Sequence, residues 1–147
     1  MDQELDVEQL IRRSAMPRDL GIEFADLFPI RVVATMPVDD RHLQPLGFLH
    51  GGASVTLAES VATVGAWLNC PPGKMALASS VNASYFRPKR SGGRLVVVGI
   101  PDYVGSEKQV WEVDIRDESG ERVCASRCTL AVVDLDLGSP LDVEDPA

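Results

Sequence analysis

Two glycines and one acidic residue form the part of this sequence best suited to chemistry. His50, Gly51 and Gly52 precede a long apolar run, and Glu59 follows eight residues after Gly51. If the run is a helix, its first backbone N–H groups lack an intrahelical acceptor and carry partial positive charge. The Gly51 N–H would then stabilise a carbonyl oxygen that gains negative charge, with Glu59 as a base or nucleophile.

Each of these residues also has a structural interpretation. A Gly-Gly pair at a helix start more often serves the backbone than an anion, and a lone histidine such as His50 more often caps the helix. Glu59 differs, because no basic residue stands three or four positions away and burying an unpaired carboxylate is costly. We therefore interpret Glu59 as functional.

A long helix over residues 51–69, ended by the Cys-Pro-Pro-Gly run at 70–73, is predicted to position these groups. Leu57, Val61, Val64 and Leu68 form an apolar stripe on one face. Glu59 points roughly opposite it among small residues that include Ala62 and Ala66, so we expect the helix to be buried on more than one face. Eight residues of helix rise about 12 Å. Gly51 and Glu59 of one chain therefore cannot reach the same carbonyl, so two chains related by a two-fold axis would share each site.

The remaining chain has the patterns of strands. We predict an extended segment over 22–38 that bends at Pro29, and later strands over 75–87, 95–104, 107–116 and 121–133. A turn at 117–120 joins the last two, and such short links require antiparallel pairing. The sequence thus predicts an α+β fold, an antiparallel sheet wrapped around one long central helix. Residues 4–16 predict a short amphipathic helix that stops at Pro17.

Size and composition indicate a single globular domain. The chain has 147 residues, 45% apolar and 24% charged. We divide it into an N-terminal helical segment (1–19), the main domain (20–133) and an acidic tail (134–147) that we expect to be flexible. No stretch approaches about 20 consecutive apolar residues, and the acidic start is unlike a secretory leader, so we expect a cytoplasmic protein without a membrane span.

The charge pattern limits the partners. A net charge of −8 argues against nucleic acid. Against that background four basic residues fall within eight positions, which favours a phosphorylated small ligand or marks a solvated loop: Arg87, Lys89, Arg90 and Arg94. With only His42 and His50 and three cysteines of unsuitable spacing, we expect neither a metal site nor a disulfide.

The run from 44 to 60, QPLGFLHGGASVTLAES, resembles the hotdog-fold acyl-CoA thioesterases, as do Ser84 to Pro88, Gly105-Ser106 and the turn at 117–120. Within that family it is similar to the branch of the Arthrobacter-type 4-hydroxybenzoyl-CoA thioesterase and of the phenylacetate-, menaquinone- and enterobactin-pathway thioesterases. The likeness covers about residues 20 to 133. It implies the hotdog fold, hydrolysis of an aryl- or medium-chain acyl-CoA to free acid and CoA without a cofactor, and a homodimer or homotetramer.

The resemblance also implies roles for particular residues. Glu59 would be the nucleophile or base, and Gly51 of the neighbouring chain would donate its N–H to the thioester oxygen. Gln44 and His50 would lie near the carbonyl and the leaving sulfur, and Thr63 would orient the carboxylate or water. The residues expected to bind substrate or CoA are Arg87, Ser106, Gly52, Tyr85, Lys89 and Arg90.

Two other functions compete with hydrolysis. One is a hotdog hydratase or dehydratase, whose His-Phe-Pro-Gly type motif is absent here. The other is a non-catalytic acyl-CoA sensor that uses the same pocket. The combination of Glu59, Gln44 and His50 favours the enzyme. The sequence leaves the acyl group open among dihydroxynaphthoyl, phenylacetyl-type and medium-chain groups.

Overall fold

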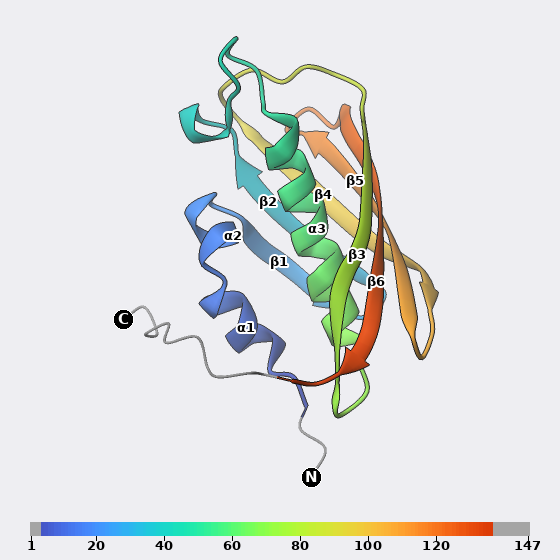
Figure 1. The fold of residues 1–147 in the computed structure, drawn as a ribbon. Helices are drawn as coiled ribbons and strands as arrows, with labels where there is room; N and C mark the ends of the chain where they lie inside the picture. Colours follow the sequence, from blue (N-terminus) through green and yellow to red (C-terminus); the bar gives the residue numbers. More distant parts are fainter. Residues whose placement is uncertain (1–3, 137–147) are drawn as a thin grey trace.

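The computed structural model describes residues 4–136 and shows an antiparallel sheet wrapped around one long helix (Figure 1). This confirms the predicted α+β fold. The elements are α1 Val7–Arg13, α2 Ala15–Asp19, β1 Glu23–Phe28, β2 Arg31–Pro37, the 3₁₀ turn η1 Asp40–His42, α3 Gly51–Leu68, β3 Lys74–Tyr85, β4 Arg94–Val104, β5 Lys108–Asp117 and β6 Arg122–Asp134.

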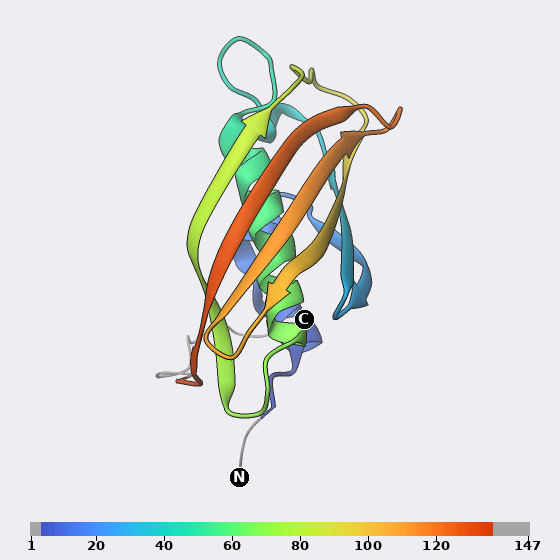
Figure 2. The same ribbon diagram turned by 90° about the vertical axis from the view of Figure 1, so that its right-hand side faces the viewer.

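The strand order places β3 at an edge of the sheet. The six strands run in the order β1-β2-β4-β5-β6-β3, and every neighbouring pair is antiparallel. Although β3 follows α3 directly in the chain, it pairs only with the last strand, β6 (Figure 2). Its other edge is therefore unpaired within the described part of the chain.

The core lies between α3 and the concave face of the sheet. The predicted stripe is confirmed at Leu57, Val61 and Val64, which are buried. Ala62 and Ala66, which flank Glu59, are fully buried as well, so the predicted burial of α3 on more than one face is confirmed. The curved sheet surrounds α3 on more than one side, so the buried face of the helix is wider than its most apolar stripe.

A buried polar chain fixes the C-terminal half of α3 against β5. The Trp111 indole N–H donates to Gln109 Oε1 at 3.1 Å, and Gln109 Nε2 donates to the Ala66 carbonyl oxygen at 3.1 Å. A Cβ on Gly65 would overlap the Trp111 ring, so glycine permits this close approach of helix and sheet.

The N-terminal segment differs from its prediction. The single helix stopping at Pro17 is wrong, since α1 ends at Arg13, Ser14 is extended, and α2 contains Pro17. Proline is tolerated there because the N–H groups of a first helical turn have no intrahelical acceptor. Both short helices flank α3 (Figure 1).

Several other expectations can be compared with the structure. The extended segment over 22–38 is the β1–β2 hairpin, with its turn at Pro29 and Ile30. The three cysteines are unpaired. No helix among residues 4–136 has the length and apolar character needed to cross a bilayer. Residues 137–147 of the predicted acidic tail lie outside the described residues.

Candidate active site

The N-terminal end of α3 presents one free backbone donor. His50 is the N-cap residue, and its Nδ1 accepts a hydrogen bond from the Gly52 N–H at 2.8 Å. The Gly51 N–H has no hydrogen-bond acceptor among residues 4–136. Because Nδ1 of His50 is the acceptor, its ring proton resides on Nε2. His50 thus caps the helix and still offers an N–H donor next to Gly51.

Tyr85 at the end of β3 lies against this helix terminus. Its hydroxyl donates to the Gly51 carbonyl oxygen at 3.1 Å. A Cβ on residue 51 would stand 2.9 Å from Cζ and Oη of the tyrosine, so glycine is needed for this contact. Partial burial, with a smaller effect from Cys124, raises the pKa of Tyr85 and keeps its hydroxyl protonated as a donor.

Backbone and side-chain hydrogen bonds hold the loop before α3. The Gln44 Oε1 accepts from the Leu46 N–H and, at 3.5 Å, from the Phe48 N–H. Its Nε2 has no acceptor within the described residues, so the amide can donate outward. The Leu49 N–H bonds the Lys89 carbonyl at 2.7 Å.

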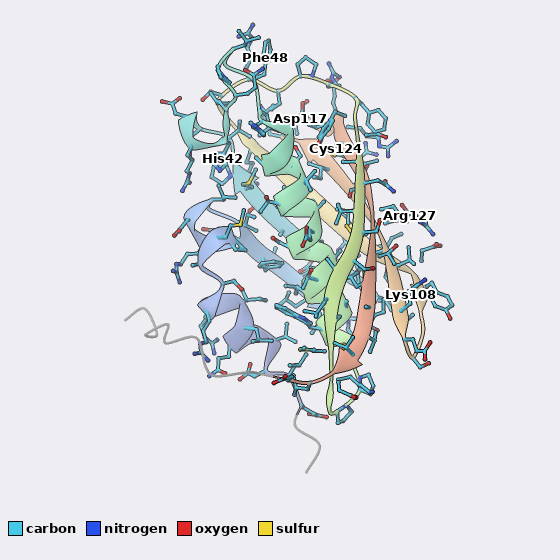
Figure 3. The ribbon with its side chains drawn as sticks, viewed as in Figure 1. His42, Phe48, Lys108, Asp117, Cys124 and Arg127 are labelled. Carbon is cyan, nitrogen blue, oxygen red and sulfur yellow. The ribbon has the colours of Figure 1, made fainter. Side chains whose placement is uncertain are left out.

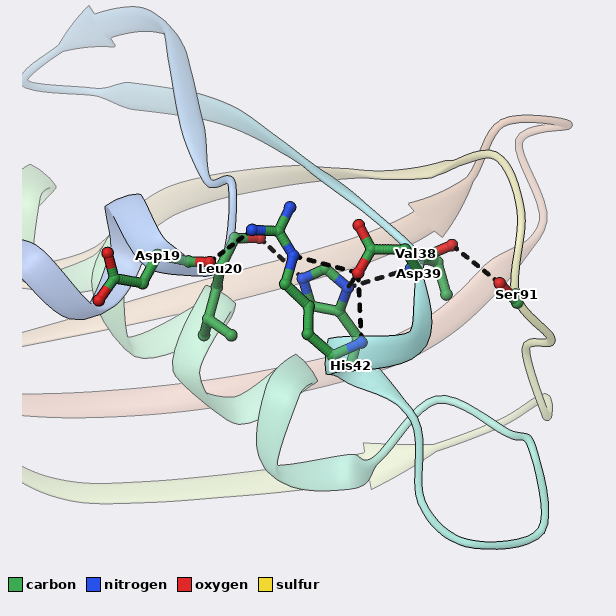
Figure 4. Close-up of polar contacts among 7 residues, drawn as sticks. Asp19, Leu20, Val38, Asp39, His42 and Ser91 are labelled. Carbon is green, nitrogen blue, oxygen red and sulfur yellow. Dashed lines mark hydrogen bonds and ion pairs between the residues drawn. The ribbon is translucent and has the colours of Figure 1, made fainter.

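His42, considered above only as a metal ligand, braces the same loop. Its carbonyl accepts from the His50 N–H at 2.8 Å. Its Nδ1 accepts from the Asp39 N–H at 3.1 Å, and its Nε2 donates to the Leu20 carbonyl at 2.7 Å (Figure 4). The ring is buried. This histidine therefore ties the loop before α3 to the N-terminal segment.

A cavity of about 490 Å³ opens at this end of α3. Its lining brings together five of the residues singled out in the sequence: Gln44, Gly51, Tyr85, Arg87 and Lys89. Ser54 also lines it and was missed, since a serine among the apolar residues of a helix has no distinctive pattern. The Ser54 residue is 1% exposed, and its hydroxyl is the one buried side-chain polar atom without a partner among the described residues.

The basic residues at this cavity are partly neutralised by acidic residues of the β5–β6 turn. Arg87 forms an ion pair with Glu121. The Lys89 Nζ lies 3.1 Å from Glu118 Oε1 and 2.9 Å from the Gly92 carbonyl oxygen. The Arg90 guanidinium stacks on the Phe48 ring, 4.4 Å from its centroid, and does not line the cavity. The positive patch is thus weaker than the sequence predicts.

Glu59 lies in a different cavity, of about 250 Å³, between α3 and the N-terminal helices. Its half-buried carboxylate has no hydrogen bond or ion pair with any described residue. Thr63 lines the same cavity, and its hydroxyl has no internal hydrogen bond. The Thr56 and Ser60 hydroxyls, in contrast, donate to backbone carbonyls one turn earlier, at 2.8 and 2.6 Å. Glu59 and Thr63 are therefore the groups that remain available to a ligand.

The other predicted residues lie outside these two cavities. Gly52 is exposed, and its N–H is used by His50. Ser106 lines a shallow site with Tyr103, Glu107 and Lys108 at the β4–β5 turn. Figure 3 shows Lys108 far from Phe48, at the opposite end of the sheet. Ser106 of one chain is therefore distant from its own Gly51.

Residues 4–136 contain neither a cluster of potential metal ligands nor a cysteine thiol with a lowered pKa. No group of three or more His, Cys, Asp or Glu that could hold a metal ion occurs in residues 4–136. Burial raises the pKa of Cys70 to about 11. It has the same effect on Cys124, which reaches about 11 with a smaller contribution from Asp114. Thiols held neutral in this way are poor nucleophiles near pH 7.

A helix wrapped by an antiparallel sheet, with a free amide at its first turn and an unpaired carboxylate two turns later, defines a hotdog protein with groups suited to attack on a carbonyl. Residues 46–124 match the family model of the Thioesterase superfamily, and the chain belongs to that family. Two curated relatives support this. A 1,4-dihydroxy-2-naphthoyl-CoA hydrolase from Escherichia coli is 44% identical over 115 residues, 78% of this chain and 83% of the relative.

A proofreading thioesterase, EntH, from Cronobacter turicensis is 41% identical over 114 residues, which cover 78% of this chain and 82% of the relative. The crystal structure of a thioesterase from Haemophilus influenzae superposes with a TM-score of 0.81 at 37% identity, covering 95% of this chain and 97% of that one. The family and fold implied by the resemblance are confirmed, and the chain is a thioester hydrolase.

Proposed function

We propose that the protein hydrolyses an aryl- or medium-chain acyl-CoA thioester to free acid and CoA, at a site shared by two chains. One observation carries the proposal. The free Gly51 N–H and the unpaired Glu59 carboxylate lie on one helix, about 12 Å apart, and face cavities that share no lining residue. Because both must reach one carbonyl group, a second chain has to supply one of them.

The free edge of β3 offers a way to bring two chains together. This strand has 12 residues, and its unpaired side carries N–H and C=O groups that can extend the sheet. Small residues at 78–80 and the 52% exposed Leu77 form a surface that a second copy can cover. Two copies paired antiparallel across a two-fold axis would bring Glu59 of one chain toward Gly51 of the other, twice per dimer.

The proposed reaction uses groups that have no internal partner. The Gly51 N–H donates a hydrogen bond to the thioester oxygen on which negative charge develops, and the Gln44 amide donates nearby. Glu59 of the partner takes a proton from water or attacks the carbonyl carbon itself, with the Thr63 hydroxyl orienting the carboxylate or the water. The C–S bond breaks, and the Nε2–H of His50 donates a hydrogen bond to the leaving thiolate. In the base route, the proton that Glu59 took from water passes to this sulfur. In the nucleophile route, water then hydrolyses the anhydride between the acyl group and Glu59, which frees the acid, restores the carboxylate and supplies the proton of the thiol.

This chemistry needs no cofactor. A thioester and water give an acid and a thiol, so no electron is exchanged and the atoms balance. For the CoA part, Tyr85, Arg87 and Lys89 line the cavity next to Gly51. Arg90 stacks on Phe48, a lining residue, and Gly52 directly follows Gly51, so both could contact CoA from outside the cavity. Ser106, at the far end of the sheet, would reach CoA from another chain. The name of the Escherichia coli relative supports an aryl-CoA among the substrates.

Release of free thiol from benzoyl-CoA and hexanoyl-CoA tests this proposal. We expect turnover by the natural sequence and a loss of about 10³-fold in kcat for Glu59→Gln. Glu8→Gln, at an exposed carboxylate of α1 that lines neither cavity, is the matched control and should retain full activity. Undiminished turnover by Glu59→Gln would contradict the assignment. Tight binding of both esters without turnover by the natural sequence would instead support the sensor.

A further inference from the structure

We infer that the cavity beside Glu59 holds the acyl group of the thioester and that Met16 of α2 sets the size of that group. The inference rests on the proposed hydrolysis at Glu59 and goes beyond it, since it assigns a selectivity role to the N-terminal helices. The family model matches only residues 46–124, so α1, α2 and β1 lie outside the matched segment. A preference for one acyl group that is set by α1, α2 and β1 would therefore be a property of the segment outside the family match.

The walls of the cavity differ in polarity. The α3 side carries the Glu59 carboxylate and the Thr63 hydroxyl, whereas the opposite side is mostly apolar. Because the carbonyl carbon must lie within reach of Glu59, the group attached to it has to extend along this opposite side. Its apolar lining comes from both short helices, β1 and the end of α3: Ile11, Met16, Pro17, Phe24, Val64 and Trp67. An apolar acyl group is favoured in these surroundings.

One side of the cavity is held more firmly than the other. The Trp67 indole N–H donates to the Ala76 carbonyl at 3.1 Å, which fixes the ring between α3 and the sheet. Met16 lies in a five-residue helix without a side-chain cap, and it is 62% exposed. An unbranched thioether adapts its shape readily. Met16 is therefore the adjustable side chain at the mouth, and Trp67 belongs to the fixed wall.

Hydrogen bonds connect α2, which lines the Glu59 cavity, to the segment before α3 that borders the Gly51 cavity. The Arg41 guanidinium donates to the Asp19 carbonyl at 2.5 Å, and His42 donates to the Leu20 carbonyl at 2.7 Å (Figure 4). These two bonds hold the end of α2 against the loop that precedes α3. Changes in Met16 should therefore alter the mouth of the cavity without releasing the helix that carries it.

The volume selects the class of acyl group. An apolar cavity of about 150 Å³ is enough to hold benzene. The cavity of about 250 Å³ thus has room for one substituted ring or two fused rings. It is below the roughly 300 Å³ at which pockets for larger ligands begin. A compact aryl group would fill this cavity, whereas a long straight acyl chain would extend beyond its mouth.

Variants of Met16 test this inference with four CoA esters: acetyl-CoA, benzoyl-CoA, 1-naphthoyl-CoA and palmitoyl-CoA. The natural sequence should have its highest kcat/KM with one of the two aryl esters. Met16→Ala opens the mouth and should raise the naphthoyl-to-benzoyl ratio of kcat/KM about tenfold, whereas Met16→Trp should lower it about tenfold. Ile30→Ala, at an exposed apolar residue in the β1–β2 turn, is the control and should leave the ratio unchanged.

The outcomes separate the inference from the function on which it rests. If both Met16 variants hydrolyse benzoyl-CoA with an unchanged substrate ratio, or if palmitoyl-CoA is the best ester of the natural sequence, the inference is wrong and hydrolysis stands. If the natural sequence releases no thiol from any of the four esters, the proposed function is wrong. Because Met16 is exposed, both variants should keep the melting temperature of the natural sequence, which verifies folding.

Discussion

The two cavities along α3 differ in what surrounds them. The cavity at Gly51 is formed by the loop before the helix, the end of β3 and the basic residues that follow it. The cavity at Glu59 has an unpaired carboxylate on one side and apolar side chains of the N-terminal helices on the other. In the proposed function, the first would receive the anionic CoA part of the ligand and the second its apolar acyl part. A thioester that joins both parts needs the two cavities adjacent, which one chain does not provide.

At the Gly51 cavity, the largest expected effect comes from removing the backbone N–H of residue 51. His50 has φ −68° and ψ 131°, which suits a residue before proline, and proline is accepted at the first position of a helix. Gly51→Pro should therefore keep α3 and remove the N–H donor, while its Cβ also meets Tyr85, and we expect kcat to fall about 100-fold.

Gly51→Ala is the matched variant, because it meets Tyr85 in the same way and keeps the N–H. Its kcat should fall much less than that of Gly51→Pro. Equal losses in the two variants would show that steric contact, and not the donor, matters at this end of the helix. Thiol release under saturating benzoyl-CoA measures both.

A smaller effect should mark the Gly51 cavity as the one that receives CoA. Arg87→Ala should raise KM for benzoyl-CoA about tenfold, since an interaction with phosphate is lost. The N-acetylcysteamine ester of benzoate lacks the nucleotide, so its KM should not change. Glu121→Gln removes the carboxylate that competes for Arg87 and should lower KM for benzoyl-CoA. Equal changes in KM for the two esters would contradict the assignment of this cavity to CoA.

The Cys124 thiol, on the strand that pairs with Tyr85, should make the free energy of unfolding fall at alkaline pH. Cys124 is in register with Tyr85 and fully buried, and burial raises its pKa from 9.0 to about 11. Between pH 9 and pH 11 the unfolded chain loses this proton and the folded chain keeps it. Stability is thus complete below pH 9 and decreases by on the order of 1 kcal/mol as the pH rises to 11.

Denaturant unfolding at pH 8 and pH 10.5 measures this difference, and Cys124→Ala should reduce it. An unchanged pH dependence in Cys124→Ala would show that other groups cause the loss.

The smallest expected effect concerns Ser54, at the edge of the Gly51 cavity. Because its buried hydroxyl lacks a partner, Ser54→Ala should raise the free energy of unfolding by up to about 1 kcal/mol. Ser126→Ala is the control, since the Ser126 hydroxyl donates to the Asn82 carbonyl at 2.7 Å and its removal should destabilise. Destabilisation by Ser54→Ala would mean that the hydroxyl has a partner in solution.

Local patterns predicted the elements that carry the site. The helix over 51–69 corresponds to α3, and the strand over 107–116 corresponds to β5, because periodicity reports which faces of an element are covered. The separation of Gly51 from Glu59 followed from helix geometry alone. These features depend on neighbours within one element and so can be obtained from the sequence.

Features that depend on distant residues were not predicted. The pairing of Lys89 with Glu118 joins residues 29 positions apart, and the contact of Tyr85 with Gly51 spans 34. The wall that α1 and α2 form opposite Glu59 depends on how they pack. Pro17 was misinterpreted as a stop, because the break at Ser14 turned it into an early residue of a new helix. These contacts and helix boundaries are determined by tertiary packing, which rules for single residues and local patterns do not include.

Mixing two inactive variants tests most directly whether two chains share each site. Glu59→Gln and Gly51→Pro are each expected to be nearly inactive, but a hybrid dimer has one site with both natural groups. Statistical reassembly of equal amounts makes about half of the dimers hybrid, so thiol release should return to about one quarter of the natural rate. Activity of the mixture that stays at the average of the two separate variants would contradict a site shared between chains.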